Sequence, residues 1–470
     1  MSEAREIRDP VFNFIRLTGT EADIVNSSVF QRLRGIRQLA FANLVYPGAL
    51  HTRFEHSLGV CHVTDLMAKA LDVSAEERDL LRLSALLHDI GHGPFSHISE
   101  DILEIYSDKR EPDNTYKIHE SITGDIIKQS EELNRYIRQS DIDKIIKILG
   151  SGYGDPLLHS IVSGPLDADK QDYLLRDSYF CGVKYGVFDL NQLHRELRWV
   201  EDDVEGKYLM ISKDGVHAVE QFVLAKYYIT NQVYRHRVRL ITDQMLVRAI
   251  TCGIDHDKID SLQDLYTYKS DQKYLEEYLL WDDSKFMVTL TDDKFKGKEC
   301  HDLLTRLKNR NLFKRIYQKQ IKELPEVCRL YLSGISKPKN KVLRAKLESH
   351  LWEHVCKLVS EKCNGNITCS PNNSNYLIVY DYKIKSVREM SRNDEASIPV
   401  EKGIKSPSTF EEESTLFKSI DEKLNQAFVE IYAPVSYDTP VDRTKLKKVI
   451  DEVITGHIAD FFEGEENATT

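Results

Sequence analysis

The chain has 470 residues, of which 41% are hydrophobic, and its 64 Lys and Arg against 75 Asp and Glu give a formal net charge of −11. This length and apolar content allow a large buried core, and the acidic balance argues against a protein that coats nucleic acid. The 22 glycines and 13 prolines are few for this length, which argues against collagen-like and Gly-rich β architectures and favours helices.

The apolar runs fall short of the roughly 18 residues of a membrane span, and residues 1–9 lack the apolar stretch of a secretory signal. The 8 cysteines include no CxxC pair, so we expect reduced thiols, Cys363 and Cys369 included. We therefore predict a cytoplasmic protein that binds no membrane and forms no stable complex with nucleic acid.

The first quarter of the chain carries clear secondary-structure signals. Alternating hydrophobicity predicts a strand near residues 11–17, and the spacing of apolar residues predicts a helix over 56–71. Ser74 and Glu77 form a capping-box pattern at the start of the next helix, which should stop at Gly91.

The rest of the chain is also mainly helical by pattern. Helical patterns cover residues 120–150, 155–180, 216–252, 258–330 and 441–462. A hairpin is expected over 200–214, a strand over 376–380 and a loop over 391–409. The predicted fold class is mainly α, with a helical core, small β hairpins and a C-terminal α+β region.

Four polar side chains stand out because each lies beside an apolar or tightly turned stretch: His56, His88, Asp89 and Asp169. Two imidazoles and two carboxylates suit a divalent first-row metal and leave coordination positions for water and a phosphate oxygen. Each residue alone is a weak signal, since a lone helical histidine is more often structural. The string HDIGHGPFSH (88–97) adds weight, because it places three His and one Asp at a helix end.

Two charge patterns near these residues favour an anionic ligand. Residues 24–54 contain no Asp or Glu but include Arg32, Arg34, Arg37 and Arg53. The net charge of the chain therefore does not exclude a nucleotide, because this window is locally positive. The same arginines also suit an ordinary surface or a subunit interface.

The second pattern is a helix face. Asp169, Tyr173, Arg176 and Asp177 fall at helical spacing and share one side of the predicted helix. That face would contact a metal, a phosphate and a sugar along its length. The alternative is that these residues form a charged surface exposed to solvent.

Several longer strings occur in a fixed order along residues 8–250. They are FQRLR (30–34), YPGA (46–49), RFEHSLGV (53–60), HDIGHGPFSH (88–97) and DADKQDY (167–173). With the H…HD…D pattern of the four polar residues, they resemble the HD-domain deoxynucleoside triphosphate triphosphohydrolases. The similarity is to the subgroup whose mammalian member adds a sterile-alpha-motif domain, which we do not expect in this chain.

The resemblance implies a metal centre and a proton-transfer group. His56, His88, Asp89 and Asp169 would hold the divalent metal, with Mg, Mn, Fe, Zn and Ni all open, and Asp167 is the alternative to Asp169. The residues expected to act in catalysis are His92, Glu100, His97 and His119. By the resemblance, His92 donates a proton to the leaving group, and Glu100 orients it. The alternative for the histidines is a structural role in local hydrogen bonds.

The resemblance also implies a substrate site for a deoxynucleoside triphosphate (dNTP). The residues expected on the substrate are Gln38, Arg53, Lys170, Tyr173, Asp177, Lys226 and Tyr234. Arg53 and Lys170 would meet phosphate oxygens, Gln38 and Asp177 would read the sugar 3′-hydroxyl, and Tyr234 would crowd the 2′ position. Water would attack the α-phosphorus and release a deoxynucleoside and tripolyphosphate.

Regulated members of this family form tetramers with nucleotides bound between subunits. The residues that match those nucleotide contacts here are Asn26, Gln31, Arg34, His236 and Arg237. Asn26 stands where the family has an acidic residue, which would change the base preference. GTP, dGTP or another dNTP would be the activator of a homotetramer, and a constitutively assembled enzyme is the alternative.

The resemblance divides the chain into an HD phosphohydrolase domain at 1–360, with its motif core at 24–250, and a C-terminal α+β region for regulation or oligomerisation at 361–470. Two other functions stay open: another HD phosphohydrolase, such as a nucleotidase, phosphodiesterase or nuclease, and a non-catalytic nucleotide sensor. The strings at 30–56 and 167–177 argue against the first, and the complete metal-ligand set argues against the second.

Overall fold

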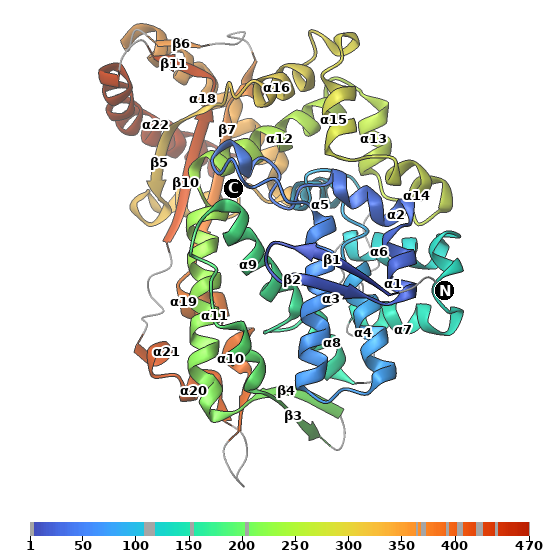
Figure 1. The fold of residues 1–470 in the computed structure, drawn as a ribbon. Coiled ribbons are helices and arrows are strands. Elements are labelled where there is room, and N and C mark those ends of the chain that lie inside the picture. The colour runs from blue at the N-terminus through green and yellow to red at the C-terminus, as the bar shows by residue number, and fades with distance from the viewer. Residues whose placement is uncertain are drawn as a thin grey trace. The chain divides into compact units, whose positions relative to one another are not determined.

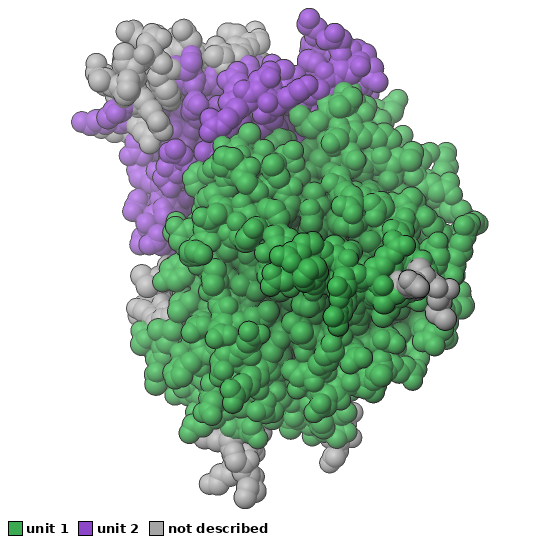
Figure 2. Space-filling view, viewed as in Figure 1, with its two compact units in different colours: residues 1–236, 260–289, 386–422 green, residues 237–259, 290–385, 423–470 purple. Residues whose placement is uncertain are grey.

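The computed structural model describes residues 4–107, 118–150, 155–202, 206–362, 365–367, 373–391, 394–401, 408–419, 426–437 and 440–469. The chain forms two compact units, unit 1 with residues 1–236, 260–289 and 386–422, and unit 2 with residues 237–259, 290–385 and 423–470 (Figure 2). Each unit is thus built from three separate stretches of chain. The expected domain boundary between residues 360 and 361 stays a prediction.

Unit 1 is mainly helical (Figure 1). Its longer helices are α1 (Gly19–Val25), α3 (Arg53–Ala70), α4 (Ala75–Leu87), α5 (His97–Tyr106), α6 (Ile118–Gln129), α7 (Gln139–Leu149), α8 (Pro156–Val162), α9 (Ala168–Cys181), α10 (Leu190–Arg195), α11 (Val216–Ile229), α13 (Asp260–Tyr266), α14 (Gln272–Leu279) and α15 (Asp283–Leu290). Its shorter helices are α2 (Ser28–Gln31), α19 (Val387–Ser391), α20 (Phe410–Glu413) and α21 (Thr415–Ser419).

The strands of unit 1 form two small sheets. They are β1 (Arg5–Asp9), β2 (Asn13–Leu17), β3 (Leu197–Asp202), β4 (Gly206–Ile211), β8 (Pro399–Val400) and β9 (Ser408–Thr409). β1 and β2 pair as an antiparallel hairpin, and the second sheet has the order β3-β4-β8-β9. β8 pairs in parallel with β4, so the segment around Val400 extends the predicted 200–214 hairpin.

Helix α3 lies at the centre of unit 1, where α4, α8 and α9 all pack against it (Figure 1). Its side chains are buried on nearly every face, because apolar and small residues recur around its whole circumference. Glu55 accepts the backbone N–H of Thr52 at 2.9 Å and so caps the start of the helix. The helix therefore enters the core with its first turn fixed, and His56 lies at the end of that turn.

Unit 2 combines helices with a three-stranded antiparallel sheet in the order β5-β10-β7. Its helices are α12 (Arg237–Asp255), α16 (Glu299–Lys308), α17 (Glu326–Leu332), α18 (Lys341–Lys362) and α22 (Pro440–Thr469). Its strands are β5 (Lys314–Gln320), β6 (Gly365–Ile367), β7 (Ile378–Ile384), β10 (Gln426–Ala433) and β11 (Val435–Tyr437), of which β6 and β11 pair with each other.

Most predicted elements are present, but several boundaries differ. The helical pattern over 120–150 is two helices, α6 and α7, and that over 155–180 is α8 and α9. The pattern over 216–252 is α11, a π-helical turn at Thr230–Tyr234 and α12. Strand β5 interrupts the helical stretch 258–330, because an edge strand with charged residues gives little apolar alternation.

Part of the loop expected over 391–409 forms β8 and β9, while residues 392–393 and 402–407 lie outside the described part. These strands form because β8 pairs with β4 of the distant hairpin, and the local sequence pattern around residues 399–409 does not predict that pairing.

The described cysteines are Cys61, Cys181, Cys252, Cys300, Cys328 and Cys356, and all are free thiols. Cys363 and Cys369 lie outside the described residues. None of the helices that the structure describes combines the length and the apolar run that crossing a bilayer requires.

Gly59 permits the close approach of α3 and α9. A Cβ atom at this position would overlap Asp172 Oδ1 and Arg176 Nη2. We expect Gly59→Ala to lower the free energy of unfolding by about 1–3 kcal/mol, as overpacked cores do.

The matched control is Gly124→Ala in α6, where the nearest atom to an added Cβ lies 3.9 Å away. That change should stabilise the protein by about 0.5–1 kcal/mol. Denaturant unfolding measures both, and equal stabilities for the two variants would contradict the close contact.

Candidate active site

The four predicted metal ligands converge in unit 1. His56 comes from α3, His88 and Asp89 from the end of α4, and Asp169 from the first turn of α9. His56 Nε2 lies 3.0 Å from Asp169 Oδ1 and 3.6 Å from Asp89 Oδ2. His88 Nε2 lies 3.3 Å from Asp89 Oδ1 and 4.0 Å from Asp169 Oδ1. His56, His88 and Asp169 therefore offer ligand atoms that all lie within 4.8 Å of one another, and Asp89 borders them through both of its oxygens.

A divalent metal fits this group, because each imidazole presents Nε2 and uses Nδ1 elsewhere. His56 Nδ1 bonds Asp172 Oδ2 at 2.8 Å, and His88 Nδ1 donates to the Ala85 carbonyl at 2.7 Å. These bonds leave the Nε2 lone pairs for a metal. His88 Nε2 is buried and has no hydrogen-bond partner among the described residues. A bound ion would satisfy this nitrogen.

The structure brings Asp169, and not Asp167, to the imidazoles. Asp167 caps α9 instead: it accepts the Lys170 backbone N–H at 2.6 Å and the Gly164 N–H at 2.9 Å. Burial raises the pKa of Asp167. Although burial also acts on Asp169, the nearby imidazoles lower its pKa below the ordinary value. Of these two aspartates, only Asp169 therefore presents an ionised carboxylate to His56.

The other charges of the centre are balanced against one another. Against the effect of burial, Arg53 and the histidines at 88 and 92 hold the pKa of Asp89 well below its usual range. Burial lowers the pKa of His56, but Asp169 and Asp172 outweigh it and raise the pKa to about 10. Without a metal, His56 therefore carries a proton that a metal must displace, so metal affinity should fall as the pH falls.

Glu100 gathers the three histidines predicted to act in catalysis. Its Oε1 lies 3.1 Å from His92 Nδ1, 2.9 Å from His97 Nδ1 and 3.4 Å from His119 Nδ1. The rings of His92 and His119 stack with centroids 4.2 Å apart. His92 Nε2 also lies 3.2 Å from Asp89 Oδ1, so this buried imidazole links Glu100 to the metal-binding group. The side chain of His97 is 64% exposed, which separates it from the other two.

Arg53 lies buried behind the same group. Its Nε donates to Ser96 Oγ at 2.8 Å and its Nη1 pairs with Asp89, while Nη2 has no hydrogen-bond partner among the described residues. Phe95 and Ser96 have φ of 62° and 57°, which non-glycine residues rarely adopt. Asp283 holds this turn by accepting the Phe95 N–H at 2.7 Å. The turn thus positions Arg53 and leaves one guanidinium nitrogen for a ligand.

Three of the residues predicted on the substrate gather around a fourth, Asp177. Its Oδ2 accepts the Tyr234 hydroxyl, and its Oδ1 lies 2.7 Å from His51 Nε2. The Tyr173 and Tyr234 rings lie 6.3 Å apart. Gln38 donates its backbone N–H to the His51 carbonyl at 3.1 Å, and its Oε1 is buried with no partner among the described residues. These contacts bring two tyrosines and several polar side chains together.

The two lysines predicted on the substrate are paired with carboxylates of the chain itself. Lys170 Nζ donates to Asp167 Oδ2 at 2.6 Å. Lys226 Nζ donates to Asp394 Oδ2 at 2.9 Å and to Glu395 Oε1 at 2.6 Å, and Asp394 also lies 3.9 Å from Lys170. A phosphate would have to compete with these acidic groups for both ammonium ions.

Three of the residues predicted for an activating nucleotide lie close together. Asn26 follows α1, and Gln31 ends α2. The side-chain Oε1 of Gln31 accepts a hydrogen bond from Arg34 Nε at 2.8 Å. His236 is the last residue of its stretch in unit 1, and Arg237 begins α12 in unit 2. Of the five residues, only Arg237 therefore belongs to unit 2, and all five roles stay predictions.

Two family patterns match the sequence: the HD domain over residues 53–155 and the HD associated region over residues 188–342. A relative from Bacillus subtilis, the uncharacterized protein YwfO, is 30% identical over 333 residues, which cover 67% of this chain and 72% of the relative. The chain belongs to the HD-domain family. This membership supports a metal-dependent hydrolase, and the mainly α fold predicted from the sequence is confirmed.

Other relatives and two solved structures are also similar. The human deoxynucleoside triphosphate triphosphohydrolase SAMHD1 is 29% identical over 67% of this chain and 55% of its own length. The uncharacterized protein MJ1154 of Methanocaldococcus jannaschii is 38% identical over 54% of this chain and 51% of its own length. The chain thus spans about half the length of these two relatives.

The structures cover more of the chain. A phosphohydrolase from Bacteroides thetaiotaomicron superimposes with a TM-score of 0.68 at 25% identity, over 92% of this chain and 100% of that one. A hypothetical protein from Aquifex aeolicus gives a TM-score of 0.65 at 27% identity, over 92% of this chain and 96% of that one. The architecture of this HD-domain protein is therefore shared along nearly its whole length.

Three residues of the HD site were missed in the sequence. Asp172 lies in the string DADKQDY, three positions after Asp169, so its role as the partner of His56 had a signal that was not used. His51 lies two residues before Arg53 but in no pattern of its own. Asp283 has no sequence signal, because its place beside the Phe95 turn depends on tertiary packing.

The Asp172–His56 bond yields a test of the metal centre. We expect Asp172→Asn to weaken metal affinity by about 10–100-fold, since the carboxylate orients His56 and raises its basicity. Isothermal titration with Mn²⁺ measures the effect.

Asp9→Asn is the matched control, because Asp9 shares the buried Arg176 with Asp172 but makes no contact with His56. It should lower stability and leave metal affinity unchanged. Equal losses of affinity in both variants would assign the effect to the fold and not to His56.

Proposed function

We propose that this HD-domain protein is a metal-dependent dNTP triphosphohydrolase, which converts a dNTP and water to a deoxynucleoside and tripolyphosphate. The observation that carries the proposal is the bond between His92 and Asp89, which joins a group fit for a metal to the Glu100 network. The group around Asp177 suits a sugar, and three similar curated proteins bear the name of this activity, two of them SAMHD1 from human and chicken.

The residues of the chain divide the chemistry among them. When bound, the metal would activate the attacking water and polarise a phosphoryl oxygen. Arg53 would donate its remaining nitrogen to the α-phosphate and stabilise the charge that develops there. The bond between the α-phosphorus and O5′ breaks, and the leaving oxygen takes a proton.

His92 is the proton donor in this proposal. Burial and the charge of Arg53 lower the pKa of His92 to about 4 in the free protein. The negative charge of a bound triphosphate acts in the opposite direction, so His92 takes up a proton as the substrate binds. Glu100 Oε1 lies 3.1 Å from the other ring nitrogen, Nδ1, and its negative charge would keep the imidazole oriented.

The sugar would lie against Asp177 and the two tyrosines. In this arrangement Asp177 accepts a hydrogen bond from the 3′-hydroxyl, Gln38 lies beside the same group, and the Tyr234 ring fills the space that a 2′-hydroxyl would need. The preference for deoxyribose would follow from this crowding.

The regulatory expectations belong to the same proposal. A cytoplasmic homotetramer would bind an activating GTP, dGTP or dNTP through Asn26, Gln31, Arg34, His236 and Arg237. Particle mass measured by light scattering, with and without each nucleotide, tests this part by itself.

A nucleotidase is the second candidate, and one observation favours it. Lys170 and Lys226, which a triphosphate needs, are held by the carboxylates of Asp167, Asp394 and Glu395. A nucleoside monophosphate would not have to displace these carboxylates.

Product analysis separates the two functions. The protein is incubated with each dNTP or deoxynucleoside monophosphate, with Mn²⁺ or Mg²⁺, and with or without GTP or dGTP. Tripolyphosphate from a dNTP is the expected product, detected by ion chromatography. Hydrolysis of monophosphates alone would replace the proposal by the nucleotidase, and release of pyrophosphate or single phosphates from a dNTP would contradict it.

His92 and His97 form a matched pair for the proton-transfer step, because both contact Glu100 but only His92 reaches Asp89. We expect His92→Gln to lower kcat by about 10²–10⁴-fold, the usual loss of a general acid, with metal affinity kept. His97→Gln should lower kcat far less. A larger loss of kcat in His97→Gln than in His92→Gln would assign the general acid to His97 instead.

A further inference from the structure

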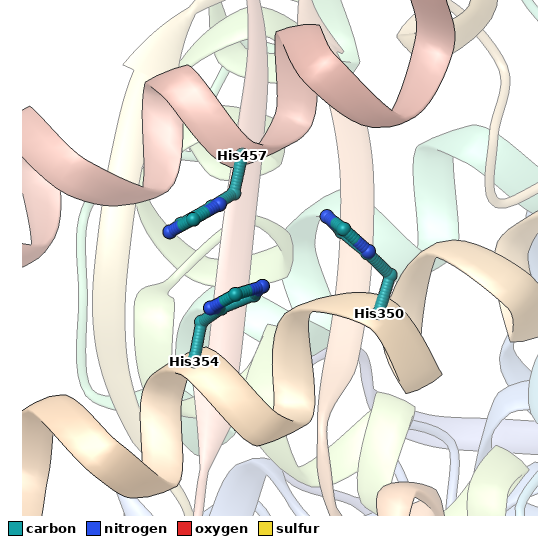
Figure 3. A group of neighbouring side chains, drawn as sticks. All are labelled: His350, His354 and His457. Carbon is teal, nitrogen blue, oxygen red and sulfur yellow. The ribbon is translucent and has the colours of Figure 1, made fainter. Parts of the chain in front are cut away.

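Three histidines meet between two helices of unit 2. His350 and His354 lie one turn apart on α18, and His457 lies opposite them on α22 (Figure 3). Each offers a ring nitrogen, and these nitrogens all lie within 4.8 Å of one another. The spacing of four residues places the first two rings on the same face of α18, and α22 packs against that helix.

Packing alone does not account for this cluster. The His354 and His457 rings stack with centroids 3.6 Å apart, and the His350 ring lies 5.1 Å from His354. His350 Nε2 is buried with no hydrogen-bond partner in the described part of the chain. An apolar side chain would pack between the helices without leaving a buried nitrogen unsatisfied. The three rings therefore suit a ligand that accepts the lone pairs of their nitrogens.

The surroundings of His354 favour its neutral imidazole. Burial and then the neighbouring His457 and His350 lower the pKa of His354, and Lys357 acts in the same direction while Glu353 opposes it. A neutral imidazole is the form that binds a metal.

We propose that His350, His354 and His457 form a second metal site, which takes a divalent ion of the zinc, nickel and copper class. Three imidazoles select such ions over magnesium, calcium and manganese, which prefer oxygen ligands. Water would complete the coordination of the ion, and Asp460 Oδ2, 4.0 Å from His457 Nδ1, lies beside the cluster. The bound ion ties the C-terminal helix α22 to α18.

The stacked arrangement is the metal-free form of the site. Bonds of about 2.0–2.1 Å from each nitrogen to one ion require the rings to converge on a point. His354 and His457 must therefore turn out of their stack when the ion binds. The His457 side chain is 27% exposed, so solvent gives its ring room to turn.

The test uses the full chain with the HD centre disabled by His88→Ala and Asp169→Ala. Titration with Co²⁺ should show one equivalent of binding with the absorption bands of a four-coordinate nitrogen site, which Zn²⁺ then removes. Adding His354→Ala or His457→Ala should weaken Co²⁺ binding on the order of 100-fold, the loss expected for one ligand of three. Absence of stoichiometric Co²⁺ binding, or binding unchanged by these substitutions, overturns the proposal.

A matched control comes from another histidine of the same unit. His256 lies with Cys252 and Glu299 in a group that also has metal-ligand residues, but its Nδ1 is 2.7 Å from Asn375 Nδ2 and so already has a partner. His256→Ala should leave Co²⁺ binding unchanged, and loss of binding there would overturn the assignment to the three histidines.

A second measurement keeps the test valid if a substitution disturbs folding. Each variant is first compared by thermal unfolding in the presence of a chelator. Zn²⁺ should then slow amide hydrogen exchange in α18 and α22 of the parent and not of His354→Ala. Equal protection in both would overturn the proposal.

Discussion

The metal-binding group depends on a buried chain of charges between α3 and α9. Asp172 and Arg176 have fully buried side chains, and Arg176 also pairs with Asp9 at 2.8 Å. A buried ion pair is stable only when each charge keeps its partners, because the interior cannot solvate a lone charge. Asp172 meets that condition by bonding Arg176 on one side and His56 Nδ1 on the other. The orientation of His56 is therefore a consequence of how the two helices pack, and Gly59 supplies the space.

The same logic explains how so many ionised groups fit around one point. Asp89, which is buried, and Asp169, which is partly exposed, lie beside positive neighbours that keep them charged, and the histidines and Arg53 supply that charge. A proton on His56 completes the balance in the metal-free protein. Replacing that proton by a divalent ion adds positive charge, which the surrounding carboxylates accommodate and which prepares the site for an anionic substrate. The acidic chain can thus hold a polyanion, because the charge that matters is local.

The sequence predicts the parts of this site that lie in short motifs and misses those that only tertiary structure assembles. His56, the 88–89 pair and Asp169 are each marked by a string of residues, and the helices that carry them follow from apolar spacing. The helix break at 163–167 has a signal in Gly164 and Pro165 that apolar spacing alone does not take into account, whereas the π turn before Arg235 has no comparable break in helical propensity. Asp283 reaches the Phe95 turn from nearly two hundred residues further along the chain, a contact that no local pattern contains.

The three histidines of unit 2 illustrate this limit most clearly. His350 and His354 carry the spacing of a metal-binding helix face, yet two histidines make an incomplete site, and His457 lies about a hundred residues further on. Only the packing of α22 on α18 completes the set. Its donors are nitrogens alone, whereas the HD centre mixes nitrogens with carboxylate oxygens. Ions such as zinc and nickel suit both sets, but manganese and magnesium suit only the mixed one. Metal titrations of this protein will therefore report on the HD centre alone when they use Mn²⁺, and on both sites when they use Zn²⁺.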